Sequence, residues 1–353
     1  MTSAVSSSPA SLLLLGLDGP GPRALLRLAR DSERVPEVLT RLRPLEAIVD
    51  QIAGTASVAA DLPERADAVV ASTLSTDVGA DVLVPAAVRR DALEAIIDTA
   101  VRIAAPDGHV IILSSTRAYG AKPGNPVPIP EDAPISGIDD GGFGGDVLHI
   151  ERRVEQLAAQ HPDLTVTVVR AACVVGPGVD TSMTRHFEPR RLLVIDGDEP
   201  MWQFCHIDDL ATAVLTCLEH RIAGPVTAAS PGHLTQAAVQ TISGRGRFAV
   251  PEAMALRSAS RLHRLGMLVT SGEDLAFARF PLVVSAQRLR DAGWAATHDN
   301  ADCVAVMLEE IRTNRMLASL RRDAVATTAS AAVALAGRAA LVGIRRRHTG
   351  ANR

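Results

Sequence analysis

The feature that most constrains the fold is an alternation of short apolar runs with longer amphipathic segments. Apolar runs with the length of a buried strand are Leu12–Leu15, Ala68–Ala71, Val110–Leu113 and Val166–Val169. Segments with helical periodicity lie between them, at Arg23–Arg30, Ala87–Ala105 and Val147–Gln160. Continuous apolar strands joined by helices are typical of parallel sheets covered on both faces. We therefore predict an α/β fold built on a doubly wound parallel sheet.

The composition is that of an ordinary globular protein. Of the 353 residues, 47% are apolar and 22% are charged, which allows a substantial core. The formal net charge of -4 argues against electrostatic binding of nucleic acid. The four cysteines show no CxxC spacing, which favours reduced thiols over a disulfide framework or a metal site. Because the first residues lack the basic region of a signal peptide, we expect a cytoplasmic protein.

Several motifs follow one another in a characteristic order. They are GLDGPGPRAL from Gly16, LSSTRAYG from Leu113, DVLHIERRVEQL from Asp146, VVRAACVVGPG from Val168 and FCHIDDLATAVLTCLE from Phe204. In order and spacing they resemble the NAD-dependent epimerase/dehydratase family, the extended short-chain dehydrogenase/reductases, in an actinobacterial form with a degenerate active site. The resemblance runs from about Leu12 to Ile311 and implies a Rossmann-type sheet with a smaller C-terminal substrate lobe. It also implies NAD or NADP as cofactor, a nucleotide sugar as partner and a homodimer.

The resemblance divides the chain into three parts. Residues 1–178 form the nucleotide-binding domain, to which residues 203–230 return. Residues 179–202 and 231–318 form the substrate lobe, where Trp202 stands at the family's usual diphosphate-binding arginine. Residues 319–353 form an Ala/Arg-rich tail. Since alanine contributes little transfer free energy, we expect Ala324–Ile344 to be a packed or partner-binding helix, with a membrane-surface helix as the alternative and a membrane span as the weakest one.

The glycine-rich loop should approach a pyrophosphate at the start of a helix. Gly16 and Gly19 match the family pattern GxxGxxG, but the third glycine falls on Pro22, with Gly21 one step early. Proline has no backbone N–H, although it is tolerated in the first helical turn. Gly16, Gly19 and Gly21 are therefore the predicted cofactor-binding residues, with weakened binding. The alternative is a loop that only packs helix against strand.

The adenosine end of the cofactor site depends on two positions of the resemblance. Asp61 matches the family position beside the adenine, and its alternative role is a strand-end cap. Arg41 and Arg43 lie where the family has an acidic ribose ligand. These arginines could bind the 2′-phosphate of NADP or be solvated, so the choice between NAD and NADP stays open.

The family's proton-transfer pair is missing. Active members have a tyrosine at the start of a helix and a lysine four residues later, and these positions align with Phe143 and Val147. Phenylalanine has no titratable group, and valine has neither a charge nor a donor. The one tyrosine, Tyr119, lies in the STRAYG motif, and the one lysine, Lys122, follows it in a loop. Ser115 matches the family's catalytic serine and remains the catalytic candidate, with a strand-end hydrogen-bonding role as the alternative.

Other polar residues near these motifs receive separate roles. Asp146 and His149 are the nearest candidates for a substitute base, but helical geometry turns His149 away from position 143. His206 is expected to be structural, and Asp208 and Asp209 are expected to cap the helix that follows it.

Two functions are compatible with these residues. The first is a nucleotide-binding pseudoenzyme, an NAD(P)-binding protein with a binding or regulatory role and without the tyrosine/lysine chemistry. Phe143, Val147 and Pro22 favour it. The alternative is an active NAD(P)-dependent epimerase/dehydratase or oxidoreductase with non-standard acid/base residues, which the retention of Ser115 and of the glycines favours. Neither hypothesis identifies a substrate.

Overall fold

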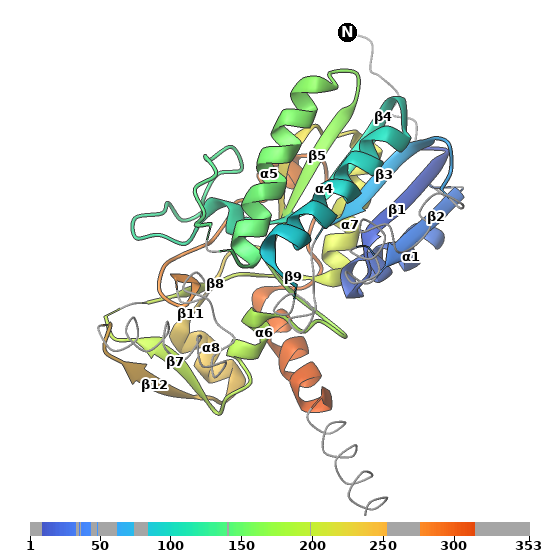
Figure 1. Cartoon of the computed structure of the whole chain (residues 1–353). Helices are drawn as coiled ribbons and strands as arrows, with labels where there is room; N and C mark the ends of the chain where they lie inside the picture. The colour runs from blue at the N-terminus through green and yellow to red at the C-terminus, as the bar shows by residue number, and fades with distance from the viewer. Residues whose placement is uncertain are drawn as a thin grey trace, which may run out of the picture. The chain divides into compact units, whose positions relative to one another are not determined.

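A parallel sheet of six strands forms the centre of the structure (Figure 1). Its strands, in spatial order, are β10 (Gly224–Ala228), β5 (Thr165–Ala171), β4 (Ala104–Ser115), β3 (Ala66–Ser72), β1 (Ser11–Leu17) and β2 (Glu37–Arg43). Each pair of neighbours is parallel, which confirms the predicted doubly wound sheet. This computed structural model describes residues 9–32, 35, 37–43, 48, 62–73, 84–139, 141–197, 199–252 and 276–314. Residues 1–308 form one unit and residues 309–353 another, of which 309–314 are described and helical.

Helices cover both faces of the sheet, because successive side chains of a strand point to opposite faces. Leu12 and Leu14 of β1 lie in one core with α1 (Pro20–Arg30) and α7 (Ile207–His220). Leu13 and Leu15 lie in a second core with α4 (Ala86–Ile103) and α5 (Phe143–Gln160). Residues on both sides of the strands are therefore apolar, as the unbroken apolar runs predicted.

The predicted helices are present, but several of their ends differ. The helices predicted from Arg23 and from Val147 begin earlier, at Pro20 and Phe143. The helix predicted over Ala87–Ala105 ends at Ile103, and Ala104 already has extended backbone angles, φ -55° and ψ 133°. Pro106 follows Ala105, and a proline disfavours the helical conformation of the residue before it. The helix therefore stops early and passes directly into β4.

Smaller elements follow the main sheet. They are β6 (Cys173–Val175) paired with β9 (Phe204–His206), β7 (Arg191–Ile195) paired with β12 (Gly246–Val250), β8 (Met201–Trp202) paired with β11 (Leu234–Thr235), η1 (Thr116–Tyr119), α6 (Ser182–His186), α8 (Gln236–Ser243) and α11 (Gln287–Asp291). Phe187 packs edge-to-face on Trp202 and Phe204, with ring centroids 5.0 and 6.0 Å apart. In the described part of the chain, no helix is long and apolar enough to cross a membrane. The tail prediction for Ala324–Ile344 lies outside the described residues.

A buried ion pair attaches α5 to the sheet. The Arg170 guanidinium on β5 donates from Nε and Nη2 to the two carboxylate oxygens of Glu151, at 2.9 and 2.8 Å. Ser114 on β4 donates to the same carboxylate at 2.6 Å. The side chains of Arg170 and Glu151 are 5% and 1% exposed. Burial works against the charge of Arg170, but the hydrogen bonds and negative charge of Glu151 raise its pKa.

The first prediction follows from this pair. Glu151→Gln leaves the Arg170 charge buried without a counterion, which should lower the free energy of unfolding by about 3–5 kcal/mol. Urea denaturation followed by circular dichroism measures this loss. The matched control is Glu155→Gln, one turn along the same helix and exposed. Equal stability of the two variants would contradict a structural role for the pair.

A buried histidine in β4 makes the fold sensitive to acid. His109 Nε2 lies 2.6 Å from the Thr167 hydroxyl, which donates its own proton to the Ile222 carbonyl. The imidazole must therefore donate from Nε2, and Nδ1 is buried without a partner in the described structure. Burial lowers the pKa of His109 to about 3.

We expect this histidine to reduce stability as the pH falls. Below its unfolded pKa near 6.5, the unfolded chain gains a proton that the native His109 does not accept until about pH 3. This group alone should lower the free energy of unfolding by about 2 kcal/mol between pH 7 and pH 5. His109→Asn should show a correspondingly smaller loss in urea titrations at the two pH values. His220→Asn, at an exposed histidine, is the control, and parallel behaviour of both variants would disprove the assignment.

Candidate functional site

The loop after β1 lies at the carboxyl edge of the sheet, where open α/β folds bind their ligands. Gly16 has φ +112°, and a Cβ atom there would lie 2.4 Å from the carbonyl oxygen of Ser72 on β3. Only glycine fits this close approach. Gly21 is buried where α1 meets Leu210 of α7, with 3.9 Å between its built Cβ and the Leu210 side chain. Gly16 is therefore required by the close approach of β1 to β3, whereas a Cβ at Gly21 would make only an ordinary contact.

The start of α1 offers few backbone donors. Helices leave their first N–H groups unpaired, and these groups normally receive an anion. Here Pro20 and Pro22 have no N–H, and the N–H of Gly19 donates to Asp18 Oδ1 at 2.8 Å. After Pro22, the N–H of Arg23 already donates to the Gly19 carbonyl at 3.1 Å. The Gly21 N–H is the remaining donor of this turn.

An ion pair lies beside this helix start. Arg23 donates from Nε to Asp18 Oδ1 at 2.9 Å and from Nη2 to Oδ2 at 2.5 Å. The side chains are 67% and 27% exposed. The hydrogen bond from Arg23 lowers the pKa of Asp18, against a smaller opposing effect of burial. Asp18 is therefore a carboxylate at neutral pH, placed where the fold usually receives a phosphate.

The adenosine end of the site is only partly described. β2 ends at Arg43, whose carbonyl oxygen accepts the N–H of Asp18 at 2.9 Å. Arg43 therefore lies directly beside the glycine-rich loop, as a ribose-binding position would. Asp61, the predicted adenine-side residue, lies outside the described residues.

The two positions expected to align with the family's proton-transfer pair, Phe143 and Val147, make packing contacts. Phe143 is the first residue of α5, and the Arg117 guanidinium lies over its ring, 5.2 Å from the centroid. Phe277 lies on the same guanidinium, at 4.4 Å. Val147 is 1% exposed. The Arg117 guanidinium thus lies over two aromatic rings at the start of α5.

Ser115 closes β4 and begins the short helix η1. Its Oγ accepts the backbone N–H of Arg117 at 3.3 Å, and the residue is 9% exposed. This is the geometry of a helix cap.

The chain's one tyrosine is part of the core. The Tyr119 hydroxyl donates to the Glu131 carbonyl at 2.9 Å and accepts from Arg170 Nη1 at 2.9 Å. The residue is 2% exposed. Burial raises the pKa of its hydroxyl, and the nearby Arg170 has a smaller, lowering effect. Its proton is therefore committed to an internal bond, so Tyr119 does not replace the missing tyrosine.

The two candidate substitute bases turn towards α4. Asp146 accepts from Arg89 Nε at 2.7 Å and from Arg90 Nε at 3.2 Å, and its side chain is 9% exposed. His149 Nε2 lies 2.7 Å from Glu94 Oε1. Both polar groups therefore join helix to helix.

The prediction that Asp208 and Asp209 cap α7 is wrong. The cap is His206, whose Nδ1 accepts the N–H of Asp208 at 3.2 Å. Asp209 instead accepts from Thr297 Oγ1 at 2.6 Å, and its Oδ2 lies 2.9 Å from His298 Nδ1. Because Asp209 is 1% exposed and lies 88 residues before Thr297 in sequence, local helix-start rules could not reveal these partners.

The imidazoles of His206 and His298, which take part in these contacts, are stacked. The rings of His206 and His298 lie 3.8 Å apart between centroids. Burial and the neighbouring His298 lower the pKa of His206. In the described ranges, no group of three or more histidine, cysteine or acidic side chains has the arrangement of a metal site.

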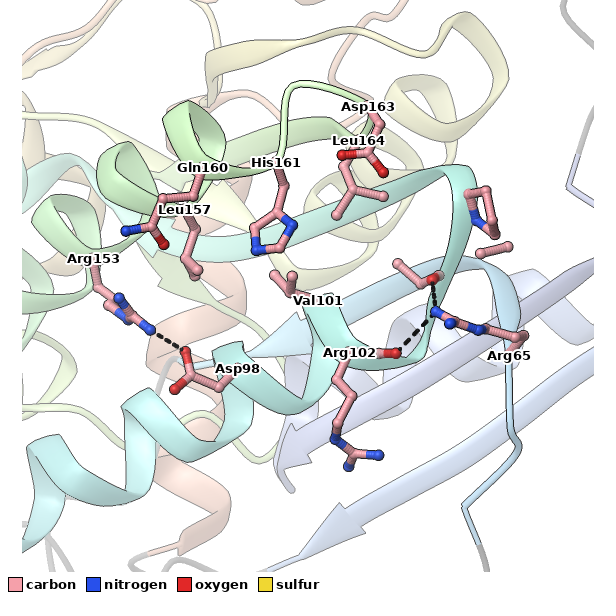
Figure 2. Close-up of a pocket in the computed structure, with 13 residues that line it drawn as sticks. Arg65, Asp98, Val101, Arg102, Arg153, Leu157, Gln160, His161, Asp163 and Leu164 are labelled. Carbon is pink, nitrogen blue, oxygen red and sulfur yellow. Dashed lines mark hydrogen bonds and ion pairs between the residues drawn. The ribbon is translucent and has the colours of Figure 1, made fainter.

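A separate cavity of about 530 Å³ lies at the amino edge of the sheet, where α4 and α5 end (Figure 2). Arg153 and Asp98, which both line the cavity, form an ion pair at 2.7 Å. Arg65 donates to the carbonyl oxygens of Arg102 and Ala104 at 3.2 and 2.8 Å. Basic side chains complement the negative ends of helices, and this cavity is at the opposite edge from the glycine-rich loop.

Comparisons with known proteins agree with the fold and the sequence motifs. The chain is 29% identical over 185 residues to an uncharacterized protein of Mycobacterium tuberculosis H37Rv, Rv0501, covering 51% of this chain and 48% of that one. It thus spans about half the length of the curated relatives it matches.

Solved structures share the fold at low sequence identity. RMD from Pseudomonas aeruginosa complexed with NADPH has a TM-score of 0.54 at 18% identity, covering 85% of this chain and 99% of that one. Human epimerase family protein SDR39U1 with NADPH gives 0.55 at 19%, covering 86% and 99%. UDP-glucose 4-epimerase from Thermus thermophilus with NAD gives 0.54 at 15%, covering 86% and 99%.

The family itself is established by sequence. The model of the NAD dependent epimerase/dehydratase family matches residues 28–228, more than half of the chain. The matched range contains the LSSTRAYG segment, the start of α5 and the FCHIDD segment. The chain belongs to the NAD dependent epimerase/dehydratase family.

Proposed function

We propose that this chain is an NAD(P)-binding protein that does not carry out the tyrosine/lysine proton transfer of its family. The observation that supports this proposal most strongly is the packing of two residues at the start of α5. Phe143 packs on Arg117, and Val147 is 1% exposed. A pseudoenzyme with a binding or regulatory role is the function that these contacts support best.

The glycine-rich loop supports binding of a dinucleotide. Gly16 permits the close approach of the backbone at the carboxyl end of β1, and Gly19 and Gly21 follow it in the loop and the first turn of α1. The glycines of this loop leave room for a dinucleotide. The loop is less suited to the charge of its pyrophosphate, because Pro20 and Pro22 supply no N–H donor. When bound, the nicotinamide would supply hydride acceptance or donation. Two of the similar structures are NADPH complexes and one is an NAD complex.

Among the described residues, those considered for acid/base chemistry are already engaged in internal contacts. General acid/base catalysis needs a titratable group within hydrogen-bonding reach of the reacting atom. Ser115 accepts the Arg117 N–H, and the Tyr119 hydroxyl is bonded inside the core. Residues 179–202 and 231–318, proposed here as the second lobe, would then present the bound state to a partner rather than turn over a substrate.

One observation favours an active enzyme as the second candidate. Ser115 lies at the carboxyl end of β4, as an orienting serine should. Asp146 and His149 would be its nearest titratable neighbours along the chain, but their partners on α4 count against that role.

Binding and turnover separate the candidates. Calorimetric titration of the full chain with NAD(H) and NADP(H) should show saturable binding in the micromolar range. Incubation with nucleotide sugars plus cofactor should give no epimerised or dehydrated product by chromatography. Product formation at ordinary enzymatic rates, about 1 per second or faster, would establish the active enzyme. Absence of binding to all four cofactor forms would end the NAD(P) proposal.

Restoring the missing pair tests the two positions separately. Phe143→Tyr should leave stability nearly unchanged, since Arg117 can stack on either ring. Val147→Lys should lower the free energy of unfolding by about 3 kcal/mol or more, because a buried ammonium loses its hydration. Val147→Ile is the matched apolar control, and urea denaturation gives the values. A double variant as stable as the wild type, with new cofactor-dependent turnover, would show that the catalytic pocket has been kept.

A further inference from the structure

The inference concerns the first turn of α1 and rests on the proposed binding of a dinucleotide. A pyrophosphate needs several donors, and in this fold the backbone normally supplies them. Here Pro20 and Pro22 have no N–H, and Asp18 already accepts the N–H of Gly19. A ligand with two phosphate groups therefore meets a single open backbone donor of this turn, from Gly21.

A side chain at the same place has the missing donors. Arg23 lies on the first turn of α1 and presents two parallel N–H donors to the Asp18 carboxylate, at 2.9 and 2.5 Å. The same planar fork matches two oxygens of a phosphate. The other cations of the helix are placed differently, since Arg27 pairs with Asp208 of α7 and Arg30 ends the helix.

The ion pair of Asp18 and Arg23 can open easily, so that a phosphate can replace the carboxylate on Arg23. Arg23 is 67% exposed and Asp18 27% exposed, and ion pairs in water contribute little to stability. Replacing the carboxylate by a phosphate therefore costs little, while it also frees the Gly19 N–H.

We infer that Arg23 is the pyrophosphate-binding group of this chain, held beside the helix start by Asp18 and transferred to the ligand when the pyrophosphate displaces that carboxylate. Asp18 thus has two effects. It keeps the guanidinium in place in the free protein, and it competes with the ligand for Arg23 and for the Gly19 N–H.

The experiment compares two probes that differ in the pyrophosphate. Full-length wild type and variants are titrated calorimetrically with ADP-ribose and with adenosine. Arg23→Ala should weaken ADP-ribose binding about tenfold or more, as loss of a charge-assisted bond does, and change adenosine binding less than about twofold. The ADP-ribose affinity of Arg23→Lys should lie between those of the wild type and Arg23→Ala, because an ammonium lacks the planar fork. Asp18→Asn should bind ADP-ribose at least as tightly as the wild type.

Arg30→Ala is the matched control, an exposed arginine at the far end of the same helix. Circular dichroism checks that each variant is folded. Equal ADP-ribose affinity of Arg23→Ala and Arg30→Ala would overturn the role of Arg23 and leave the proposed function intact. Weaker binding by Asp18→Asn would overturn the exchange. A wild type that binds neither ADP-ribose nor any NAD(P) form would overturn the proposed function, and this inference with it.

Discussion

The buried pair of Glu151 and Arg170 is the interaction on which the geometry of the site depends. It joins α5 to β5, and the hydrogen bond from Ser114 adds β4 to the same contact. Ser114 is adjacent to Ser115, and Glu151 lies two turns after Phe143 on the helix. Because a buried charge is costly without its partner, this contact fixes the start of α5 relative to the end of β4. The proposed catalytic positions, Ser115 and Phe143, are thus held in place by the same buried contact.

The structure shows packing contacts at the two positions proposed to have lost the proton-transfer pair. In the family's pattern the helix start carries a phenol and an ammonium, and both must stay accessible to a substrate. Here Phe143 and Phe277 enclose the Arg117 guanidinium, and Val147 is buried. A guanidinium stacked on rings is a stabilising contact, but its high pKa prevents it from acting as a base. Under the proposed function, these contacts favour order at the site over proton transfer.

The sequence predicted those features that depend on local pattern. The apolar runs located β1, β3, β4 and β5, and the spacing of glycines identified the turn at Gly16, where a Cβ would collide with Ser72. Local pattern could not reveal partners distant in sequence. Asp209 was expected to cap a helix, but its partners Thr297 and His298 are 88 and 89 residues away. Glu151 lies in a charged stretch of helix, so its burial became evident only with Arg170 opposite it.

The proposals for the two ends of the dinucleotide site differ in kind. At the proposed proton-transfer end, Phe143 and Val147 carry no titratable group. At the proposed phosphate end, an ion pair that can open would take the place of fixed backbone donors. Backbone donors are permanent, whereas the exposed pair of Asp18 and Arg23 is screened by salt. Recognition through Arg23 should therefore respond to ionic strength and to competing anions, which suits a protein whose role is to bind conditionally more than one whose role is to turn over.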